Sequence, residues 1–326
     1  MTESELRDAA VEGSESAYAE LVESHRRQLH AHCYRMLGSV HDAEDAVQET
    51  LLRAWRSLSS FQGRSSLRSW LYTIATNVCL RAIERRPGRV LPIGYGPPSD
   101  PHGPLGEPLV ESTWIEPYPD ERLGLDDGPV GPEARYEQRE SIELAFIAAL
   151  QHLPARQRAV LILRDVLGFS GAEVAAALGT TPASVYSMLQ RAHQTVEQRI
   201  PELSQQATLR SLGDEGLRAI VDRYVRAWEH NDVEGIAAML TESATIAMPP
   251  TPTWYRGRDA VATGLGELAL SGRMTWRVTP IRANGQLAVM AYCEDVGGTL
   301  VPNHLAVLTL RGSLIDEINF FLLTSH

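Results

Sequence analysis

The chain is 326 residues long, 44% of its residues are hydrophobic, and its formal net charge at pH 7 is -11. This length suits two or three domains, each able to bury its own core. No apolar run approaches the length of a membrane span, and the polar, acidic N-terminus lacks the features of a secretory signal, so we expect a soluble, cytoplasmic protein. The three cysteines are scattered without metal-ligand spacing, which predicts neither a disulfide framework nor a metal site.

Charge is unevenly distributed along the chain. Residues 51–90 contain eight arginines and one acidic residue, whereas residues 91–137 contain two arginines and ten acidic residues. The average charge argues against a nucleic-acid binder, but this segregation indicates one basic surface for a polyanion and a separate acidic segment.

Residues 14–90 read as consecutive helices. Ser39 followed by Asp42 resembles a capping box and begins a helix over DAEDAVQETLLRAWRSL. Its apolar residues recur at helical spacing and predict a buried stripe. A leucine among charged residues on the outward face is typical of a protein-docking surface, although a solvated helix face gives the same spacing. That face carries Asp45, Gln48, Glu49, Leu52, Arg53 and Arg56.

The next segment, FQGRSSLRSWLYTIATNVCLRAIERR, interleaves aromatic residues with arginines. Ser65 or Ser66 caps its helix. Trp70 and Tyr72 are two residues apart and cannot share one helix face, so at least one of them belongs to the core. Guanidinium groups neutralise phosphates, while aromatic faces and small polar groups such as Asn77 hold unstacked bases. The pattern favours binding of single-stranded or melted DNA.

These residues carry a resemblance to a known family. DAEDAVQE, the F-x-G loop and SWLYTIATNVCLR resemble the second conserved region of extracytoplasmic-function (ECF) sigma factors, which belong to the sigma-70 family. The resemblance implies that the first helix docks on the β′ clamp helices of RNA polymerase and that the loop and second helix capture a base of the minus-ten promoter element. It assigns polymerase contacts to Asp42, Asp45, Gln48, Glu49 and Leu52, and contacts with the melted strand to Phe61, Arg64, Ser65, Ser66, Trp70, Asn77 and Arg81.

Residues 91–135 are dense in proline, glycine and acidic residues and predict a linker. A plain flexible tether is the simplest interpretation, but Trp114, Ile115 and Tyr118 interrupt the polar sequence and indicate that it docks somewhere. The segment is similar to the linkers of SigG-like sigma factors. In sigma factors the linker enters the polymerase active cleft, so the resemblance implies that path here.

Residues 136–202 contain a helix-turn-helix pattern. Ser170 and Glu173 form a capping box, Gly179 makes the turn, and Thr181 caps a second helix with Pro182 at its first position. A bare helical hairpin shows much of this pattern. However, LPARQRAVLILRD resembles the fourth sigma region, which implies that the module reads the minus-thirty-five element and meets the polymerase β flap. The residues then expected at DNA are Thr181, Pro182, Ala183, Ser184, Tyr186, Ser187, Gln190 and Arg191.

Residues 210–326 read as two helices followed by alternating apolar segments with turns at Asn284-Gly285, Gly297-Gly298 and Gly312-Ser313. We expect an α+β domain with helices on one face of a curved antiparallel sheet. It resembles the SnoaL-like branch of the NTF2-like fold, which hosts both enzymes and inert pockets. His304 is the best candidate for a general acid or base, but no second group at a fixed spacing accompanies it. The pocket candidates are Trp228, Met248, Trp254, Tyr255 and His304.

Three functions fit parts of this chain. A SnoaL-like enzyme or ligand sensor fused to a helix-turn-helix regulator leaves the first 200 residues without a purpose. An ordinary helix-turn-helix regulator needs neither DAEDAVQE nor the helix that interleaves arginines with aromatic residues. A sigma factor employs every module. We therefore expect two all-α sigma modules and a non-catalytic α+β domain that modulates their activity. The expected partners are the RNA polymerase core and promoter DNA, with an unidentified small molecule as a further ligand of the C-terminal domain and no cofactor, metal or membrane.

Overall fold

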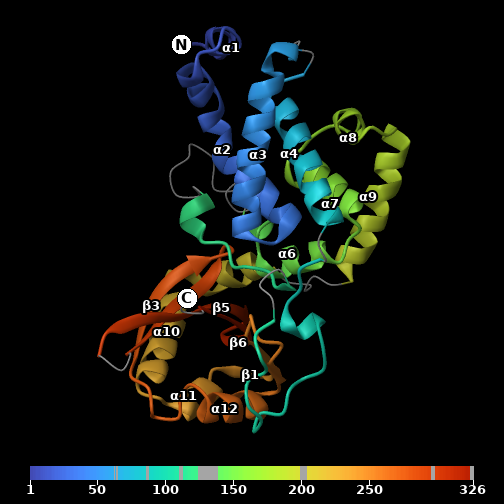
Figure 1. Ribbon diagram of the computed structural model, residues 1–326. Helices are drawn as coiled ribbons and strands as arrows, with labels where there is room; N and C mark the ends of the chain where they lie inside the picture. The colour runs from blue at the N-terminus through green and yellow to red at the C-terminus, as the bar shows by residue number, and fades with distance from the viewer. Residues whose placement is uncertain are drawn as a thin grey trace. The chain divides into compact units, whose positions relative to one another are not determined.

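The computed structural model describes residues 1–61, 63, 65–85, 88–109, 113–123, 139–198, 204–294 and 298–323. The chain forms two compact units (Figure 1). Unit 1 comprises Met1–Arg89, Glu121–Pro129 and Ala145–Ile200, and unit 2 comprises Val90–Asp120, Val130–Leu144 and Pro201–His326. The first part of the expected linker therefore belongs to the same unit as the C-terminal domain.

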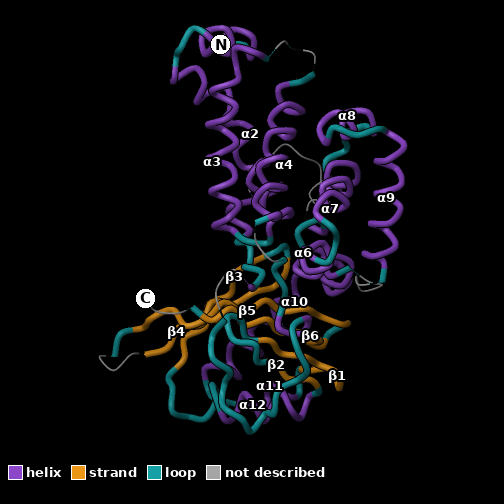
Figure 2. The backbone as a smooth tube through the Cα atoms, turned by 45° about the vertical axis from the view of Figure 1, so that its right-hand side comes forward, coloured by secondary structure: helices purple, strands orange, loops and turns teal. Residues whose placement is uncertain are grey.

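Unit 1 is helical. Its helices are α1 (Glu3–Val11), α2 (Glu15–Leu37), α3 (Val40–Ser57), α4 (Leu67–Glu84), α6 (Leu144–Gln151), α7 (Ala155–Leu161), α8 (Gly171–Leu178) and α9 (Pro182–Glu197), with a 3-10 turn at Leu58–Ser60 and a π-helical turn at Ile162–Val166. Helices α2, α3 and α4 run side by side (Figure 2). None of the described helices is long and apolar enough to cross a membrane.

The helix starts in unit 1 follow the predicted caps. The Ser39 hydroxyl accepts a hydrogen bond from the Asp42 amide at 3.0 Å and begins α3. The Ser66 hydroxyl accepts one from the Ser69 amide at 3.1 Å and begins α4, so Ser66 rather than Ser65 is the cap. Each cap satisfies a backbone donor that the helix itself leaves unpaired.

A buried arginine joins α7 to the C-terminal end of α2. The Arg158 guanidinium donates to the backbone carbonyl of Met36, to the Gln151 side-chain oxygen at 2.6 Å, and to the backbone carbonyls of Gln151 and Leu153 at 3.1 and 3.3 Å. Burial lowers the pKa of Arg158 to about 10. Carbonyls at a helix C-terminus carry partial negative charge, so they stabilise this cation.

The described part of unit 2 contains a six-stranded sheet and three α-helices longer than one turn. The strands are β1 (Leu240–Ala247), β2 (Trp254–Arg256), β3 (Trp276–Ala283), β4 (Gln286–Glu294), β5 (Leu300–Arg311) and β6 (Leu314–Leu322), and the helices are α10 (Gln205–Glu229), α11 (Val233–Ala237) and α12 (Arg258–Glu267). A 3-10 turn at Pro92–Gly94 and another at Asp120–Leu123 lie in the linker region. The strand order is β2-β1-β6-β5-β4-β3.

The sheet is mixed and not wholly antiparallel as expected. β1 pairs with β6 in parallel, whereas the other four pairings are antiparallel. Hairpin turns force an antiparallel direction, but the connection from β1 to β6 passes through the rest of the sheet and imposes no such direction. The sequence pattern within each strand is the same for both directions, so it did not reveal this pairing.

Helices α10, α11 and α12 cover one face of the sheet (Figure 1). The apolar stripe predicted on α10 forms part of this core, with Ile220, Tyr224 and Trp228 buried. The predicted turn at Asn284 and Gly285 joins β3 to β4, with positive φ angles of 53° and 68° at the two residues. Asparagine and glycine tolerate this left-handed conformation best, which explains their use in a two-residue hairpin.

Candidate functional site

The residues expected to contact polymerase lie on α3. Asp45, Gln48 and Leu52 are exposed, and the Leu52 side chain, at 43% exposure, is one of the few large apolar side chains on the surface. Residues spaced three, four and seven apart lie on one side of a helix. An acid, an amide and an apolar side chain thus follow one another along a narrow exposed stripe on α3.

Asp42 and Glu49 belong to the same expected set but have partners within the chain. The half-buried Asp42 carboxylate accepts a hydrogen bond from the Arg89 guanidinium at 2.7 Å, and Arg89 itself is buried. Glu49 is half-buried and pairs with Arg53 one helical turn later, at 2.5 Å. Local spacing did not reveal the first of these pairs because Arg89 lies 47 residues beyond Asp42.

The residues expected to contact the melted strand extend from the loop before α4 to its last turn, which contains Arg81. The rings of Phe61 and Trp70 lie 4.9 Å apart between centroids and both are half-buried. Ser65, Ser66 and Arg81 are exposed. Tyr72 is buried, which confirms the prediction that one of Trp70 and Tyr72 belongs to the core. Arg64 lies outside the described residues.

Asn77, the residue expected to hold a base, contacts α8. Its side-chain amide donates to the Thr73 carbonyl at 2.8 Å and to the Ala177 carbonyl at 3.3 Å. In the first turn of α4, the Arg68 guanidinium donates to the Leu167 carbonyl at 3.1 Å and lies 4.6 Å from the centre of the Phe169 ring. Sequence analysis counted Arg68 among the arginines interleaved with aromatic residues, but it did not reveal this contact, because Leu167 lies 99 residues away.

The helix-turn-helix pattern is confirmed in detail. Ser170 and Glu173 form a complete capping box, Gly179 ends α8 with a left-handed φ of 59°, and the Thr181 hydroxyl accepts from the Ser184 amide at 3.2 Å to begin α9. Ser184 is half-buried. The other residues expected at DNA are exposed from the N-cap to the middle of α9: Thr181, Pro182, Ala183, Tyr186, Ser187, Gln190 and Arg191.

The acidic linker docks on the C-terminal domain within unit 2. Trp114, Ile115 and Tyr118 are all at most 3% exposed, which confirms that this segment docks. The indole N–H of Trp114 donates to the Pro250 carbonyl at 2.6 Å, and the indole N–H of Trp254 donates to the Gly96 carbonyl at 2.9 Å. The linker and the C-terminal domain thus each contribute one tryptophan, and each tryptophan donates a hydrogen bond to the backbone of the other segment.

The β3–β4 turn forms the second half of this contact. Tyr118 and Asn284 exchange hydrogen bonds. The backbone N–H of Tyr118 donates to the Asn284 side-chain oxygen at 2.9 Å, and the backbone N–H of Asn284 donates to the Tyr118 carbonyl at 2.8 Å. The Gly285 amide donates to the Asp120 carboxylate at 2.8 Å. Sequence analysis identified Asn284 and Gly285 as a hairpin turn, and the structure adds a linker-binding role.

Comparisons with known proteins agree with this arrangement of modules. The family model described as Sigma-70 region 2 matches residues 21–87, Sigma-70 region 4 matches residues 143–196, and the SnoaL-like domain matches residues 221–317. The ECF RNA polymerase sigma factor SigG of Mycobacterium tuberculosis strain H37Rv is 44% identical over 307 residues, which cover 93% of this chain and 80% of SigG. The chain belongs to the ECF sigma factors.

A further relative shares part of the chain, and a solved structure shares its fold. The ECF sigma factor SigE of Mycolicibacterium smegmatis is 33% identical over 182 residues, covering 55% of this chain and 59% of SigE. The crystal structure of the ECF sigma factor SigJ of Mycobacterium tuberculosis aligns with a TM-score of 0.58 at 21% identity, covering 93% of this chain and 96% of SigJ. This sigma factor accordingly directs core RNA polymerase to promoters through two helical modules, which are followed by a SnoaL-like domain.

The pocket candidates of the sigma factor's SnoaL-like domain lie in two environments. His304 and Trp228 belong to a buried aromatic cluster, in which the His304 ring lies 4.6 Å from Phe320 and 5.3 Å from Trp228 between centroids. Met248 and Tyr255 are buried in the same core. Trp254 is also buried, but its indole N–H bonds the linker. The five residues therefore do not line one common site.

His304 is held as a neutral imidazole. Its Nδ1 lies 2.9 Å from the Asn303 side-chain oxygen, which only accepts hydrogen bonds, so Nδ1 carries the proton and Nε2 keeps its lone pair. Nε2 is buried and has no hydrogen-bond partner within the described part of the chain. Burial lowers the pKa of His304 to about 3. An imidazole of this kind is a poor general acid near neutral pH.

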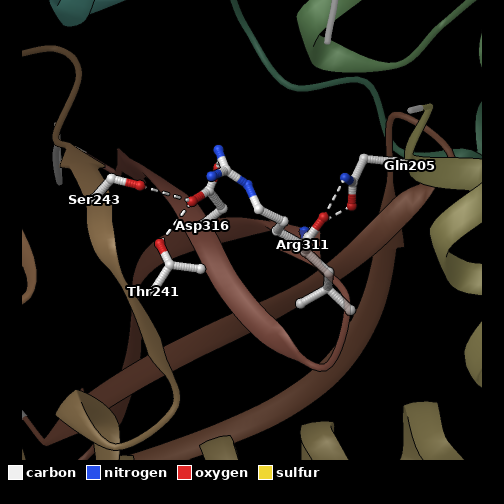
Figure 3. Close-up of polar contacts among 6 residues, drawn as sticks. Gln205, Thr241, Ser243, Arg311 and Asp316 are labelled. Atoms are coloured by element: carbon white, nitrogen blue, oxygen red, sulfur yellow. Dashed lines mark hydrogen bonds and ion pairs between the residues drawn. The ribbon is translucent and has the colours of Figure 1, made fainter. Parts of the chain in front are cut away.

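Asp316, a carboxylate near the start of β6, has hydrogen-bond partners other than His304. It accepts hydrogen bonds from Thr241 at 2.6 Å, Arg311 at 2.6 Å and Ser243 at 3.5 Å, while Gln205 bonds the neighbouring backbone of Leu310 (Figure 3). His304 pairs with Leu322, six residues beyond Asp316 on β6. At the rise of a strand this separates the two side chains by about 20 Å. They cannot act as an acid–base pair.

The buried His304 makes folding of the sigma factor sensitive to acid. Its pKa is lowered from 6.5 to about 3 in the folded state, so between these values the unfolded chain binds a proton that the folded chain does not. Stability is therefore lost as the pH falls below 6.5, by up to about 1.4 kcal/mol per pH unit. We expect His304→Phe, which keeps a ring in the aromatic cluster, to remove this loss.

Urea unfolding between pH 4 and pH 7, followed by tryptophan fluorescence, measures the difference between the two proteins. Burial raises the pKa of Glu143, in the same unit, to about 7, which has the opposite sign and favours the folded state as the pH falls. Glu143 is unchanged in the variant, so its effect cancels in the difference. His230→Phe, at an exposed position on the same domain, is the control. Equal acid dependence in His304→Phe and the unaltered chain would contradict the assignment.

Proposed function

We propose that this sigma factor binds the β′ clamp helices of polymerase through the exposed stripe of α3, formed by Asp45, Gln48 and Leu52. The observation that carries the proposal is the exposure of Leu52 between polar neighbours, since apolar atoms provide contact area and the polar groups fix the register. Asp42 instead orients Arg89, and Glu49 orients Arg53. Both carboxylates contribute to polymerase binding through the charge of the surface.

The same proposal places DNA on two helices. The half-exposed pair of Phe61 and Trp70, at the start of α4, receives an unstacked base of the minus-ten element, since every base has a face that stacks on an aromatic ring. The exposed start of α9 enters the major groove of the minus-thirty-five element, with Gln190 and Arg191 able to reach base edges. The module that carries α9 also meets the β flap.

The SnoaL-like domain acts in this proposal as a regulator that holds the linker. A linker bound to Pro250, Trp254 and Asn284 is not available to enter the polymerase cleft, the path that the family resemblance implies. The domain therefore lowers initiation until the linker is released. A catalytic role is not favoured, because His304 has no acid–base partner among the described residues and Asp316 lies at the other end of β6.

Run-off transcription with core polymerase tests both parts of the proposal. Trp114→Phe combined with Trp254→Phe keeps two aromatic rings and removes both indole N–H donors of the linker contact. Each lost hydrogen bond costs about 1 kcal/mol, so the two losses together raise the ratio of released to bound linker by about 30-fold. We expect several-fold more transcript from the double variant than from the unaltered protein.

Trp276→Phe is the matched control. Its indole N–H donates to the Ala269 carbonyl at 2.9 Å, in the same domain but away from the linker, so the same chemical change leaves the linker contact intact. Transcript levels that rise equally in the control and the double variant would show loosening of the domain and not linker release. Absence of any transcript from both the unaltered protein and the double variant with core polymerase would reject the initiation role itself.

A further inference from the structure

Tyr186 on α9 covers the first residue of α8. Tyr186 lies in the second turn of α9 and is 55% exposed, whereas Gly171, which begins α8, is buried. A methyl group at Gly171 would lie 3.2 Å from the Tyr186 hydroxyl oxygen and 3.3 Å from Cζ of its ring. Both distances are shorter than the optimum of a van der Waals contact. A side chain at Gly171 would therefore push the tyrosine away from α8.

The π-helical turn at Ile162–Val166 holds the same side of α9. The Arg164 guanidinium donates to the Phe169 carbonyl and lies 6.0 Å from the centre of the Tyr186 ring, at the outer limit of a cation–π contact. The Asp165 carboxylate lies 2.5 Å from Nε2 of His193, two turns beyond Tyr186 on α9. Single π-helical turns often occur at functional sites. Here the turn supports α9 from below and leaves the contact with Gly171 to fix the end of the tyrosine ring.

The place of the Tyr186 hydroxyl indicates what it contacts in a DNA complex. In a bound helix-turn-helix the second helix enters the major groove, while the first helix crosses the sugar-phosphate backbone. A hydroxyl over the first residue of α8 is therefore closer to a phosphate than to a base edge. The Glu173 carboxylate in the same turn opposes an anion, but two hydrogen bonds from Ser170, at 2.8 and 2.7 Å, offset its charge in part.

We propose that the Tyr186 hydroxyl donates a hydrogen bond to a DNA phosphate and that Gly171 is the positioning residue for this contact. The inference rests on the proposed role of α9 at the minus-thirty-five element. A ring that is already held in place loses less rotamer freedom when DNA binds. Because phosphates are the same at every base pair, the contact strengthens binding to any duplex by the same factor.

Tyr186→Phe and Gly171→Leu test the two parts of the proposal. The first removes only the hydroxyl, and the second displaces an intact tyrosine. Fluorescence anisotropy of the holoenzyme measures affinity for two labelled duplexes, one with the promoter and one of unrelated sequence. Each variant is expected to bind both duplexes on the order of tenfold more weakly than the unaltered protein. The double variant is expected to be no weaker than either single variant, since both changes remove the same hydrogen bond.

Ala176→Leu is the matched control, because it adds the same side chain at an exposed position of α8. Equal affinity of Tyr186→Phe and the unaltered protein overturns the phosphate contact, and so does a loss confined to the promoter duplex. Losses that multiply in the double variant overturn the positioning role of Gly171. Tyr186→Phe leaves the packing intact, so it decides the phosphate contact even if Gly171→Leu does not fold. Absence of promoter binding by the holoenzyme with any of these proteins rejects the role of α9, and this inference with it.

Discussion

Replacing both Asp45 and Leu52 by arginine is expected to prevent this sigma factor from assembling with core polymerase. The two side chains lie on the exposed stripe of α3, and the change reverses one charge and removes the apolar contact. Loss of a central contact in an interface costs about 2 to 4 kcal/mol, which is about 30-fold to 1000-fold in affinity. Fluorescence anisotropy with labelled sigma factor and core enzyme measures the affinity, and run-off transcription measures the consequence.

Folding does not account for this expected loss. Both positions are exposed, and substitutions at exposed positions without buried partners usually change stability by less than about 0.5 kcal/mol. Glu20→Arg, on the exposed surface of the neighbouring helix α2, makes the same charge reversal away from the stripe and is the control. Normal assembly of the double variant with core polymerase would show that the stripe is not the docking surface.

Arg191→Ala is expected to weaken binding to the minus-thirty-five element. Arg191 is exposed on α9, two turns and a half from the start of that helix, and its fork of donors matches the acceptor edge of a guanine. If it reads a guanine, its loss costs about 1 to 3 kcal/mol, or about 5-fold to 150-fold in affinity. A gel shift on duplex promoter DNA at one fixed salt concentration measures this change.

The salt dependence separates a base contact from a phosphate contact. A lost phosphate contact lowers the slope of log affinity against log salt by about one, whereas a lost base contact leaves that slope nearly unchanged and relaxes the preference at one base pair. Gln194→Ala, exposed on the same helix three residues later, is the control. Affinity equal to that of the unaltered protein would exclude Arg191 from both kinds of contact.

The local features of this sigma factor follow from short-range patterns in its sequence. The serine caps of α3 and α4, the capping box at Ser170 and the turn at Gly179 each depend on residues within about one helical turn. The hairpin at Asn284 depends on two adjacent residues that accept positive φ angles. Such patterns are written within a few neighbouring positions, which is why the sequence predicts them.

Tertiary structure alone decided which surfaces are engaged. The pairing of Asp42 with Arg89, the contact of Asn77 with Ala177 and the exchange of hydrogen bonds between Tyr118 and Asn284 join residues 47, 100 and 166 positions apart. The parallel pairing of β1 with β6 likewise joins distant segments.

The sequence by itself determined the two helical modules, the helix-turn-helix and the α+β domain, because hydrophobic periodicity and capping are properties of neighbouring residues. It also indicated that the tryptophan-bearing linker docks, since apolar side chains within a polar segment favour a partner surface. Only the tertiary structure determined where the linker docks and which carboxylates remain on the exposed stripe of α3. Those outcomes depend on how separate segments pack together, and no short pattern of residues encodes that packing.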